Sequence, residues 1–176
     1  MNQLMNLDYV IARIAANAGI FESLTKGTNA QQASWKPSPK EWSILEVVNH
    51  LYDEEREDFR QRLKLILTDP ALDWPPIAPQ EWVITRGYSK RDLGESLNKF
   101  LSERQESLTW LRSLSSPNLE SRHEREAGSL SAGDLLVSWL AHDFLHIRQL
   151  TRLQWQYLTE NAKPFQTQYA GPWTAT

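Results

Sequence analysis

The chain has 176 residues, of which 40% are hydrophobic and 23% are charged, and these proportions are typical of a globular protein in water. Its net charge of −3 argues against a nucleic-acid-binding surface, and the lack of cysteine excludes disulfide bonds and thiolate ligands or nucleophiles. Neither a signal peptide nor an apolar stretch of membrane length is recognisable, so we expect a single domain over residues 1–176 that lies in the cytoplasm, without nucleic-acid or membrane partners.

The first predicted helix covers residues 4–26. Its apolar residues recur every three or four positions, as they do in a helix of a bundle; they are Leu4, Leu7, Ile11, Ile14, Ala18 and Phe21. Gly27 is expected to end this helix. Residues 28–41 contain two prolines and are predicted to form a loop. Trp35 and Trp42 are expected to cover one end of the bundle, and the alternative is that they line a substrate entrance.

A second helix is predicted from a capping box at its start, in which Ser43 is the N-cap and a glutamate follows three residues later. This helix is expected to end near Leu67. The acidic run at residues 53–58 is predicted to be a solvated face. Glu54 lies on the same face as His50, one turn later, so the alternative is that its carboxylate accepts a hydrogen bond from the ring of that histidine.

Residues 69–88 contain four prolines and two tryptophans and follow no regular pattern. Roughly 20 extended residues reach about 65 Å at ~3.3 Å each, whereas a helix of roughly 25 residues is only about 38 Å long. This connection can therefore pass along the full length of a bundle, and the second and third helices are expected to be parallel. Either the segment covers a functional site, or its tryptophans only pack on the bundle surface.

The third helix is predicted to begin near Ser89, with Asp92 reinforcing its cap. Its apolar stripe consists of Leu93, Leu97, Phe100, Leu101, Leu108 and Leu111. Serines, a proline, a glycine and charged residues interrupt the helical pattern at residues 113–129. The fourth helix begins with Ser131 as its N-cap and continues without proline to about Asn161. The remaining residues are expected to form a polar tail.

Two of the four histidines lie one turn apart on the fourth helix. His142 and His146 are at positions i and i+4, so both imidazoles project from one face. Because apolar residues continue this face on both sides, the pair is predicted to point toward the core, where a divalent metal ion would satisfy both rings. The alternative is one hydrogen-bonded core histidine and one that is partly solvated. Gln149 would either orient His146 or face a substrate, and a surface or interface role is expected for Asp143 and Arg148.

His50 lies close to inward-facing apolar positions of the second helix. Either it is a histidine at the border of that helix, or it completes a three-histidine site with His142 and His146 that leaves a coordination position for water or substrate. His50 lies about 10 Å from the start of its helix, whereas His142 and His146 lie about 17–23 Å from the start of the fourth helix. If the three histidines form one site, the fourth helix must therefore extend beyond the second helix at one end. His123 lies in an irregular charged stretch and is predicted to be a solvated loop residue.

Two segments together resemble the DinB-like superfamily, which includes bacterial thiol-dependent transferases. The first segment is WSILEVVNHL at residues 42–51, and the second is GDLLVSWLAHDFLHIRQ at residues 133–149. The resemblance covers nearly the whole chain and implies an all-α fold, a single four-helix bundle in up-down-down-up order with a long crossover between helices two and three. It also implies a metal bound by one histidine of the second helix and two of the last, which match His50, His142 and His146.

Two classes of function are expected from such a site. In the first, the protein is an enzyme. A divalent ion is a Lewis acid that lowers the pKa of bound water or thiol, and the resemblance implies a low-molecular-weight thiol acting on an electrophilic substrate, with metal-dependent hydrolysis as the other reaction. In the second, it is a non-catalytic, stress-related metal-binding module. No catalytic residue is assigned, a homodimer is left open, and zinc and nickel are favoured over copper and iron among the metals that histidine binds.

Overall fold

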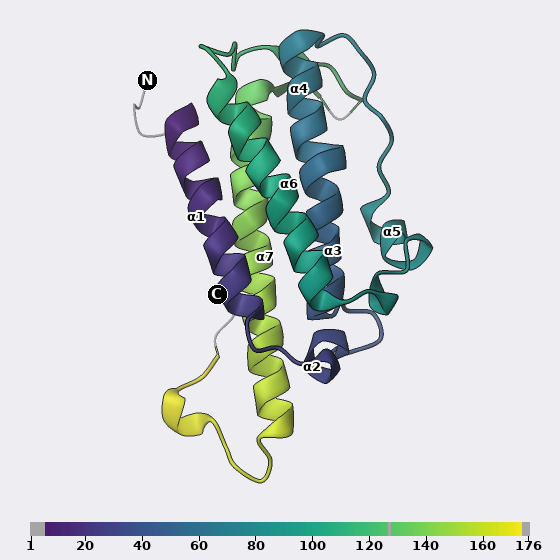
Figure 1. The fold of residues 1–176 in the computed structure, drawn as a ribbon, viewed down its shortest axis with the longest axis vertical. Helices are drawn as coiled ribbons and strands as arrows, with labels where there is room; N and C mark the ends of the chain where they lie inside the picture. The colour runs from purple at the N-terminus through teal and green to yellow at the C-terminus, as the bar shows by residue number, and fades with distance from the viewer. Residues whose placement is uncertain (1–5, 127, 174–176) are drawn as a thin grey trace.

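The computed structural model describes residues 6–126 and 128–173, and its core is a bundle of helices (Figure 1). The elements of the bundle are α1 (Leu7–Thr25), the continuous segment of α3 (Ile44–Glu54), η1 (Glu55–Phe59) and α4 (Arg60–Thr68), then α6 (Leu93–Ser113) and α7 (Ala132–Asn161). α1 and α7 run in one direction, and the other two elements run in the opposite direction (Figure 1). The fold is therefore the predicted four-helix bundle in up-down-down-up order.

The connection between α4 and α6 passes along the outside of the bundle from one end to the other (Figure 1), which allows two consecutive bundle helices to be parallel. It is not irregular throughout, because it contains helix α5 (Pro79–Thr85) and the 3-10 turn η2 (Tyr88–Lys90). Pro79 occupies the first turn of α5, where its missing backbone N–H costs no helical hydrogen bond. Gly87 joins the two elements in a left-handed conformation, with φ of 60°, which a glycine adopts without strain.

Side-chain caps define where the bundle helices begin. Ser43 and Ser131 are the N-caps of α3 and α7, as the sequence predicted, and both form capping boxes. The predicted start of the third helix near Ser89 is wrong, since Ser89 lies in η2. Instead α6 begins after Asp92, because the Asp92 carboxylate accepts a hydrogen bond of 2.9 Å from the backbone N–H three residues later. The predicted helical residue Leu4 lies outside the described residues.

Short elements lie in two segments that the sequence suggested were irregular. Residues 28–41 contain helix α2 (Ala30–Ser34), which Asn29 caps. The strands β1 (Arg122–His123) and β2 (Leu130–Ser131) pair antiparallel between α6 and α7. Elements of two to five residues are too short to show a hydrophobic period, so tertiary packing decides whether they form.

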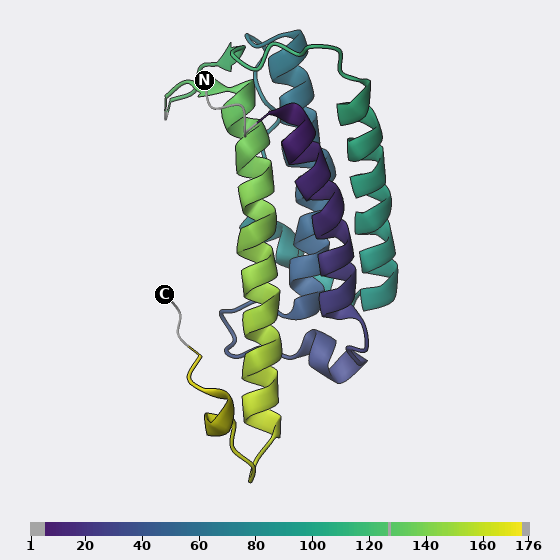
Figure 2. The same cartoon turned by 90° about the vertical axis from the view of Figure 1, so that its left-hand side faces the viewer.

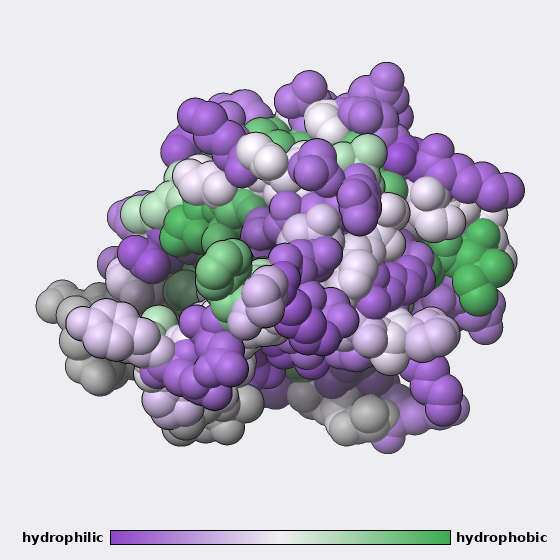
Figure 3. Space-filling view, turned by 90° about the horizontal axis from the view of Figure 1, so that it is seen from below, coloured by the Kyte–Doolittle hydropathy of each residue, from purple (hydrophilic) through white to green (hydrophobic). Residues whose placement is uncertain are grey.

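The C-terminal part of α7 extends beyond the other bundle helices at one end (Figures 1 and 2), as the positions of the histidines required. The chain then turns back beside it and forms the 3-10 turn η3 (Gln168–Ala170). Trp173 stacks on Trp155 of α7, with 5.4 Å between ring centroids. Seen from this end, the surface is mainly hydrophilic with separate hydrophobic patches (Figure 3). Within the described ranges, no helix combines the length and apolar character needed to cross a membrane.

The hydrophobic core inside the bundle has two parts, separated by a layer of buried polar side chains. One part includes Trp139 and the beginning of α7, and the other includes Phe100 and the later turns of α7. Every bundle helix contributes at least one buried polar residue between the two parts, and four of them are at most 2% exposed: Asn17 of α1, Glu55 of η1, Arg104 of α6 and Asp143 of α7. The layer is a site of ion pairing inside an otherwise apolar bundle.

This layer contradicts two predictions. The acidic run at 53–58 is not a solvated face, because Asp53, Glu54, Glu55 and Asp58 are each at most 8% exposed. Asp143 has no surface or interface position, because its carboxylate is fully buried and accepts two hydrogen bonds of 2.8 Å from Arg104. Buried carboxylates need such partners, and α6 supplies the principal one. Arg148, by contrast, is exposed.

Candidate metal centre

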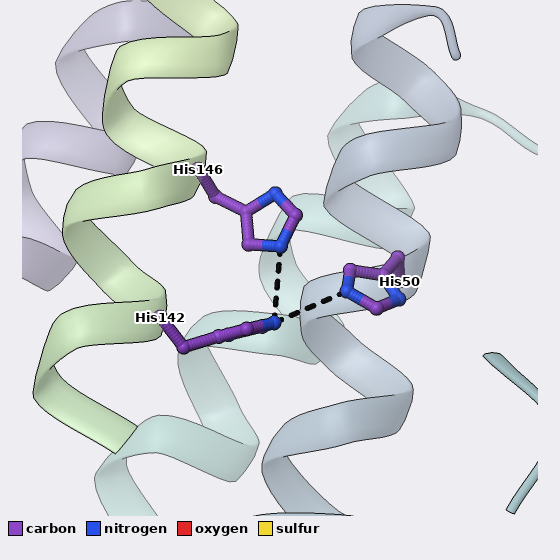
Figure 4. Close-up of side chains that lie close together, drawn as sticks. All are labelled: His50, His142 and His146. Atoms are coloured by element: carbon purple, nitrogen blue, oxygen red, sulfur yellow. Dashed lines mark hydrogen bonds between the residues drawn. The ribbon is translucent and has the colours of Figure 1, made fainter. Parts of the chain in front are cut away.

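His50, His142 and His146 lie together between α3 and α7, and their rings point toward one another (Figure 4). Nε2 of His142 lies 3.2 Å from Nε2 of His50 and 3.0 Å from Nε2 of His146. One nitrogen of each ring lies within 4.8 Å of the other two. The fold thus brings together the three histidines that the sequence singled out, although His50 and His142 are 92 residues apart in the chain.

Buried neighbours orient each of these side chains. On α3, Val47 and Leu51 are at most 2% exposed, and they place the face that carries His50 against the bundle interior. On α7, Leu150 continues the face of His146 and is 1% exposed. Asp143, the residue after His142, is held by Arg104. The polar layer therefore fixes the rotation of α7 directly beside the site.

The arrangement of the three rings fits a metal ion. A tetrahedral ion with nitrogen ligands at about 2.0–2.1 Å separates those nitrogens by about 3.3 Å, close to the two Nε2 separations found here. His146 donates from Nδ1 to Gln149 Oε1 at 2.7 Å, so its Nε2 carries the lone pair that a metal requires. Unprotonated ring nitrogens at these separations repel one another, and a divalent cation between them removes that repulsion.

The electrostatics of the site favour neutral imidazoles. Burial, followed by repulsion from His146, lowers the pKa of His50 to about 3. Burial and the neighbouring histidines lower the pKa of His142 well below its usual value. Burial also lowers the pKa of His146, against the opposing effect of its hydrogen bond to Gln149. All three rings are therefore neutral at pH 7, which is the form that binds metal.

Glu54 lies beside the site without a hydrogen bond to it. Its Oε1 is 4.0 Å from Nδ1 of His50, and neither buried atom has a hydrogen-bond partner. Burial first, and then the hydrogen bond and charge of Asp58, raise the pKa of Glu54 to about 8. The carboxyl is therefore largely protonated at pH 7. The sequence identified the proximity of this side chain to His50 correctly, while its solvated alternative is wrong.

A pocket of about 390 Å³ opens at the histidines. Its walls are formed by side chains of the loop before α3, of α3 itself, of α5 and of α7: Lys40, Glu41, Trp42, His50, Gln80, His146, Gln149 and Arg152. The ring of Trp42 packs against His50, with 4.8 Å between centroids. A small molecule can therefore reach two of the three histidines from solvent.

The crossover segment reaches this pocket near its middle, at the start of α5. Gln80 of α5 lines the pocket, and the following Trp82 packs in a small hydrophobic cluster with Trp42. Trp74, earlier in the segment, instead stacks on His123, with 4.4 Å between centroids. The tryptophans of this segment therefore pack against other side chains, and Gln80 borders the pocket; that the segment covers a functional site stays a prediction. Trp35 packs edge-on against Tyr157, and it is not part of the pocket lining.

The prediction that His123 is a solvated loop residue is wrong. Its side chain is buried between β1 and the crossover, where Nδ1 lies 2.8 Å from the carbonyl oxygen of Pro70 and the ring stacks on Trp74. It does not belong to the histidine site. Its surroundings in the sequence are charged, and the packing that buries it comes from a segment about 50 residues earlier, so no local pattern could indicate it.

Several pocket residues were not singled out from the sequence. Arg152 lies three residues after Gln149 on α7, and helical periodicity could have placed it beside that side chain. Lys40 and Gln80 carry no such signal, because they belong to a loop and to a short helix whose positions depend on tertiary packing. Charged loop residues are too common for their presence alone to indicate a site.

Comparisons with known proteins agree with this architecture. The sequence model described as the DinB superfamily matches residues 13–150. The chain is similar in structure to YfiT from Bacillus subtilis, with a TM-score of 0.76, 18% sequence identity, and coverage of 86% of this chain and 87% of that one. YfiT is described as a probable metal-dependent hydrolase with an unusual four-helix bundle topology. No match was found among curated proteins.

Proposed function

The chain belongs to the DinB superfamily, and on that premise we propose that it is a metal-dependent enzyme in which His50, His142 and His146 bind one divalent ion. The observation that carries the proposal is the convergence of three neutral imidazoles beside a pocket open to solvent. Three protein ligands leave a coordination position for a reactant. Zinc or nickel is proposed as the metal, since imidazole suits both. When bound, such an ion acts as a Lewis acid that lowers the pKa of water or a thiol.

The surrounding side chains prepare the site for this role. Gln149 holds His146 in the tautomer whose Nε2 is free. Trp42 covers one face of His50 and limits the access of solvent to that ring. The histidines serve as ligands rather than bases, because their lowered pKa values keep them from retaining a proton at pH 7. Gln149 and Gln80 border the pocket where a substrate would lie.

The reaction we propose is the transfer of a small thiol to an electrophile. The chain contains no cysteine, so a reactive sulfur must come from a substrate. The sulfur of the thiol forms a bond to the electrophilic carbon, its proton passes to solvent, and the leaving group departs with the bonding electron pair. Membership of a superfamily that includes bacterial thiol-dependent transferases supports this choice. Hydrolysis is the second candidate, and the description of the fold neighbour YfiT favours it.

A direct assay separates these reactions. Protein loaded with zinc or nickel is incubated with a panel of cellular thiols and monobromobimane, and separately with ester and amide substrates without thiol. Thiol transfer predicts catalysed bimane conjugation that His146→Ala abolishes and His123→Ala preserves. Hydrolysis would instead be established by two results together. The natural chain would conjugate the thiols no faster than His146→Ala does, and it would cleave esters or amides only when metal is bound.

A further inference from the structure

The pocket beside the histidines has a local charge opposite to that of the whole chain. Its lining contains two cations, Lys40 and Arg152, and one carboxylate, Glu41. Arg152 and Glu41 form an ion pair with a nitrogen–oxygen distance of 2.9 Å. Among the residues that the structure describes, no acidic group lies within ion-pair distance of Lys40. One positive charge is therefore left over in a protein whose net charge is −3.

The backbone ties Lys40 to the site. A turn closed by the hydrogen bond from the backbone N–H of Glu41 to the carbonyl of Ser38, at 3.1 Å, holds this loop. Two residues after Lys40, the ring of Trp42 packs on His50 at 4.8 Å between centroids. Lys40 is exposed and lines the same pocket as His50 and His146. A ligand that reaches these histidines therefore passes close to an unpaired cation.

The neighbouring amides add hydrogen-bonding capacity. Gln149 uses its carbonyl oxygen for His146, so its N–H groups remain available to a ligand. Gln80 is exposed at the same opening. Donors next to a single uncompensated cation suit a group with one negative charge and two acceptor oxygens. The pocket volume of about 390 Å³ lies at the small end of the range for small-molecule sites.

We propose that Lys40 is a specificity-determining residue that binds the carboxylate of a small substrate, while another group of the same molecule lies at the histidines. The inference rests on the proposed function, because it assumes that a ligand occupies the open position of the histidine site. It deepens that function by naming the substrate class as small carboxylates, whichever of the two reactions the site performs. A carboxylate matches the single free cation better than a dianionic phosphate does.

The test uses a matched pair of metal-binding probes. Succinic acid monohydroxamate carries a free carboxylate, and its monoamide replaces that carboxylate with a neutral group of the same size. Both bind metals through the same hydroxamate, so the ratio of their affinities isolates the distal charge. The ratio is measured at low salt from the visible spectrum of cobalt-loaded protein. The proteins compared are the natural chain, Lys40→Gln, Lys40→Glu and the control Lys99→Gln. Lys99 is an exposed lysine of α6 that is not part of the pocket lining.

We expect the natural chain and Lys99→Gln to bind the carboxylate probe about 3- to 10-fold more tightly than its amide, as charge-assisted contacts at partly exposed sites allow. Lys40→Gln should reduce this ratio to about 1, and Lys40→Glu should invert it. The assignment of Lys40 would be overturned if the natural chain bound both probes equally. It would also be overturned if the preference for the carboxylate probe persisted in Lys40→Gln at equal cobalt content. If neither probe changes the cobalt spectrum, the open metal position itself fails, and the inference falls with it.

Discussion

Replacement of Arg104 by methionine tests whether the polar layer holds the bundle together beneath the histidine site. The guanidinium is 1% exposed and donates to Glu55 at 2.9 Å, to both oxygens of Asp143 at 2.8 Å, and to the carbonyl of Ile14 at 3.1 Å. Methionine preserves much of the apolar volume and removes every one of these donors. Two buried carboxylates then face each other without a cation.

The expected cost follows from the burial of the three charges. Removing one partner from a buried ion pair costs about 3–5 kcal/mol, because a charge is left without compensation. Arg104 pairs with two carboxylates, each at most 2% exposed. We therefore expect the loss of unfolding free energy in Arg104→Met to lie at or above the upper end of this range at pH 7. The free energy of unfolding of a domain is only about 5–15 kcal/mol. For comparison, Lys163→Met breaks an ion pair that is 68% exposed on the lysine side, and it should cost less than about 1 kcal/mol.

Urea denaturation followed by circular dichroism at pH 7 and pH 5.5 measures both quantities. Arg104→Met leaves two buried carboxylates without a cation, and protonation would remove their charge, so the stability of the variant relative to the natural chain should recover as pH falls. A triple variant that adds Glu55→Leu and Asp143→Leu should regain much of the loss, since apolar packing can replace a buried ion cluster. This reasoning would be refuted if Arg104→Met lowered the free energy of unfolding by less than about 1 kcal/mol at pH 7, or if the loss at pH 5.5 equalled the loss at pH 7.

Three further predictions concern the histidine site. Gln149→Ala should weaken metal binding about 10- to 100-fold in a chelator competition, with unchanged helical circular dichroism; unaltered affinity would show that Gln149 does not orient His146. Removal of metal from the natural chain should leave the helical circular dichroism intact but lower the Tm, because an ion at about 1,000 times its Kd stabilises the fold by about 4 kcal/mol. Loss of the helical signal at room temperature would contradict a bundle that folds on its apolar core. In the metal-free protein, the lowered pKa of His50 means that the unfolded chain binds more protons than the folded chain between pH 6.5 and about 3. The free energy of unfolding should therefore decrease as pH falls through this window, by at most about 1.4 kcal/mol per pH unit for each histidine. His50→Ala should flatten this slope in a pH series of melts, and an unchanged slope would show that His50 is not buried as a neutral ring.

The features that could be predicted from the sequence are those that local spacing determines. The caps at Ser43 and Ser131 depend on residues within one turn, and both were identified correctly. The i, i+4 spacing put His142 and His146 on one face, and the length of the crossover allowed parallel helices. His50 could be joined to the pair only as one of two alternatives, because its distance from α7 depends on how two helices far apart in the sequence pack.

The polar layer could not be predicted in the same way. A run of six charged residues at 53–58 has the composition of a solvated surface, and nothing nearby in the sequence shows that Arg104, 49 residues after Glu55, pairs with the buried Glu55 carboxylate. Asp143 has the same partner from α6. His123 likewise depends on the distant Trp74. Burial of a charge is a property of its partners, and those partners become neighbours only in the folded chain.

The three-histidine site is tested most directly by the metal content of the purified protein and of its single histidine variants. Each variant is loaded with zinc or nickel, passed through a desalting column and assayed by elemental analysis, with circular dichroism as a check of folding. We predict one divalent ion per chain for the natural protein and for His123→Ala, and strongly reduced content for His50→Ala, His142→Ala and His146→Ala. Full metal occupancy in a folded His50→Ala variant would contradict the proposed site.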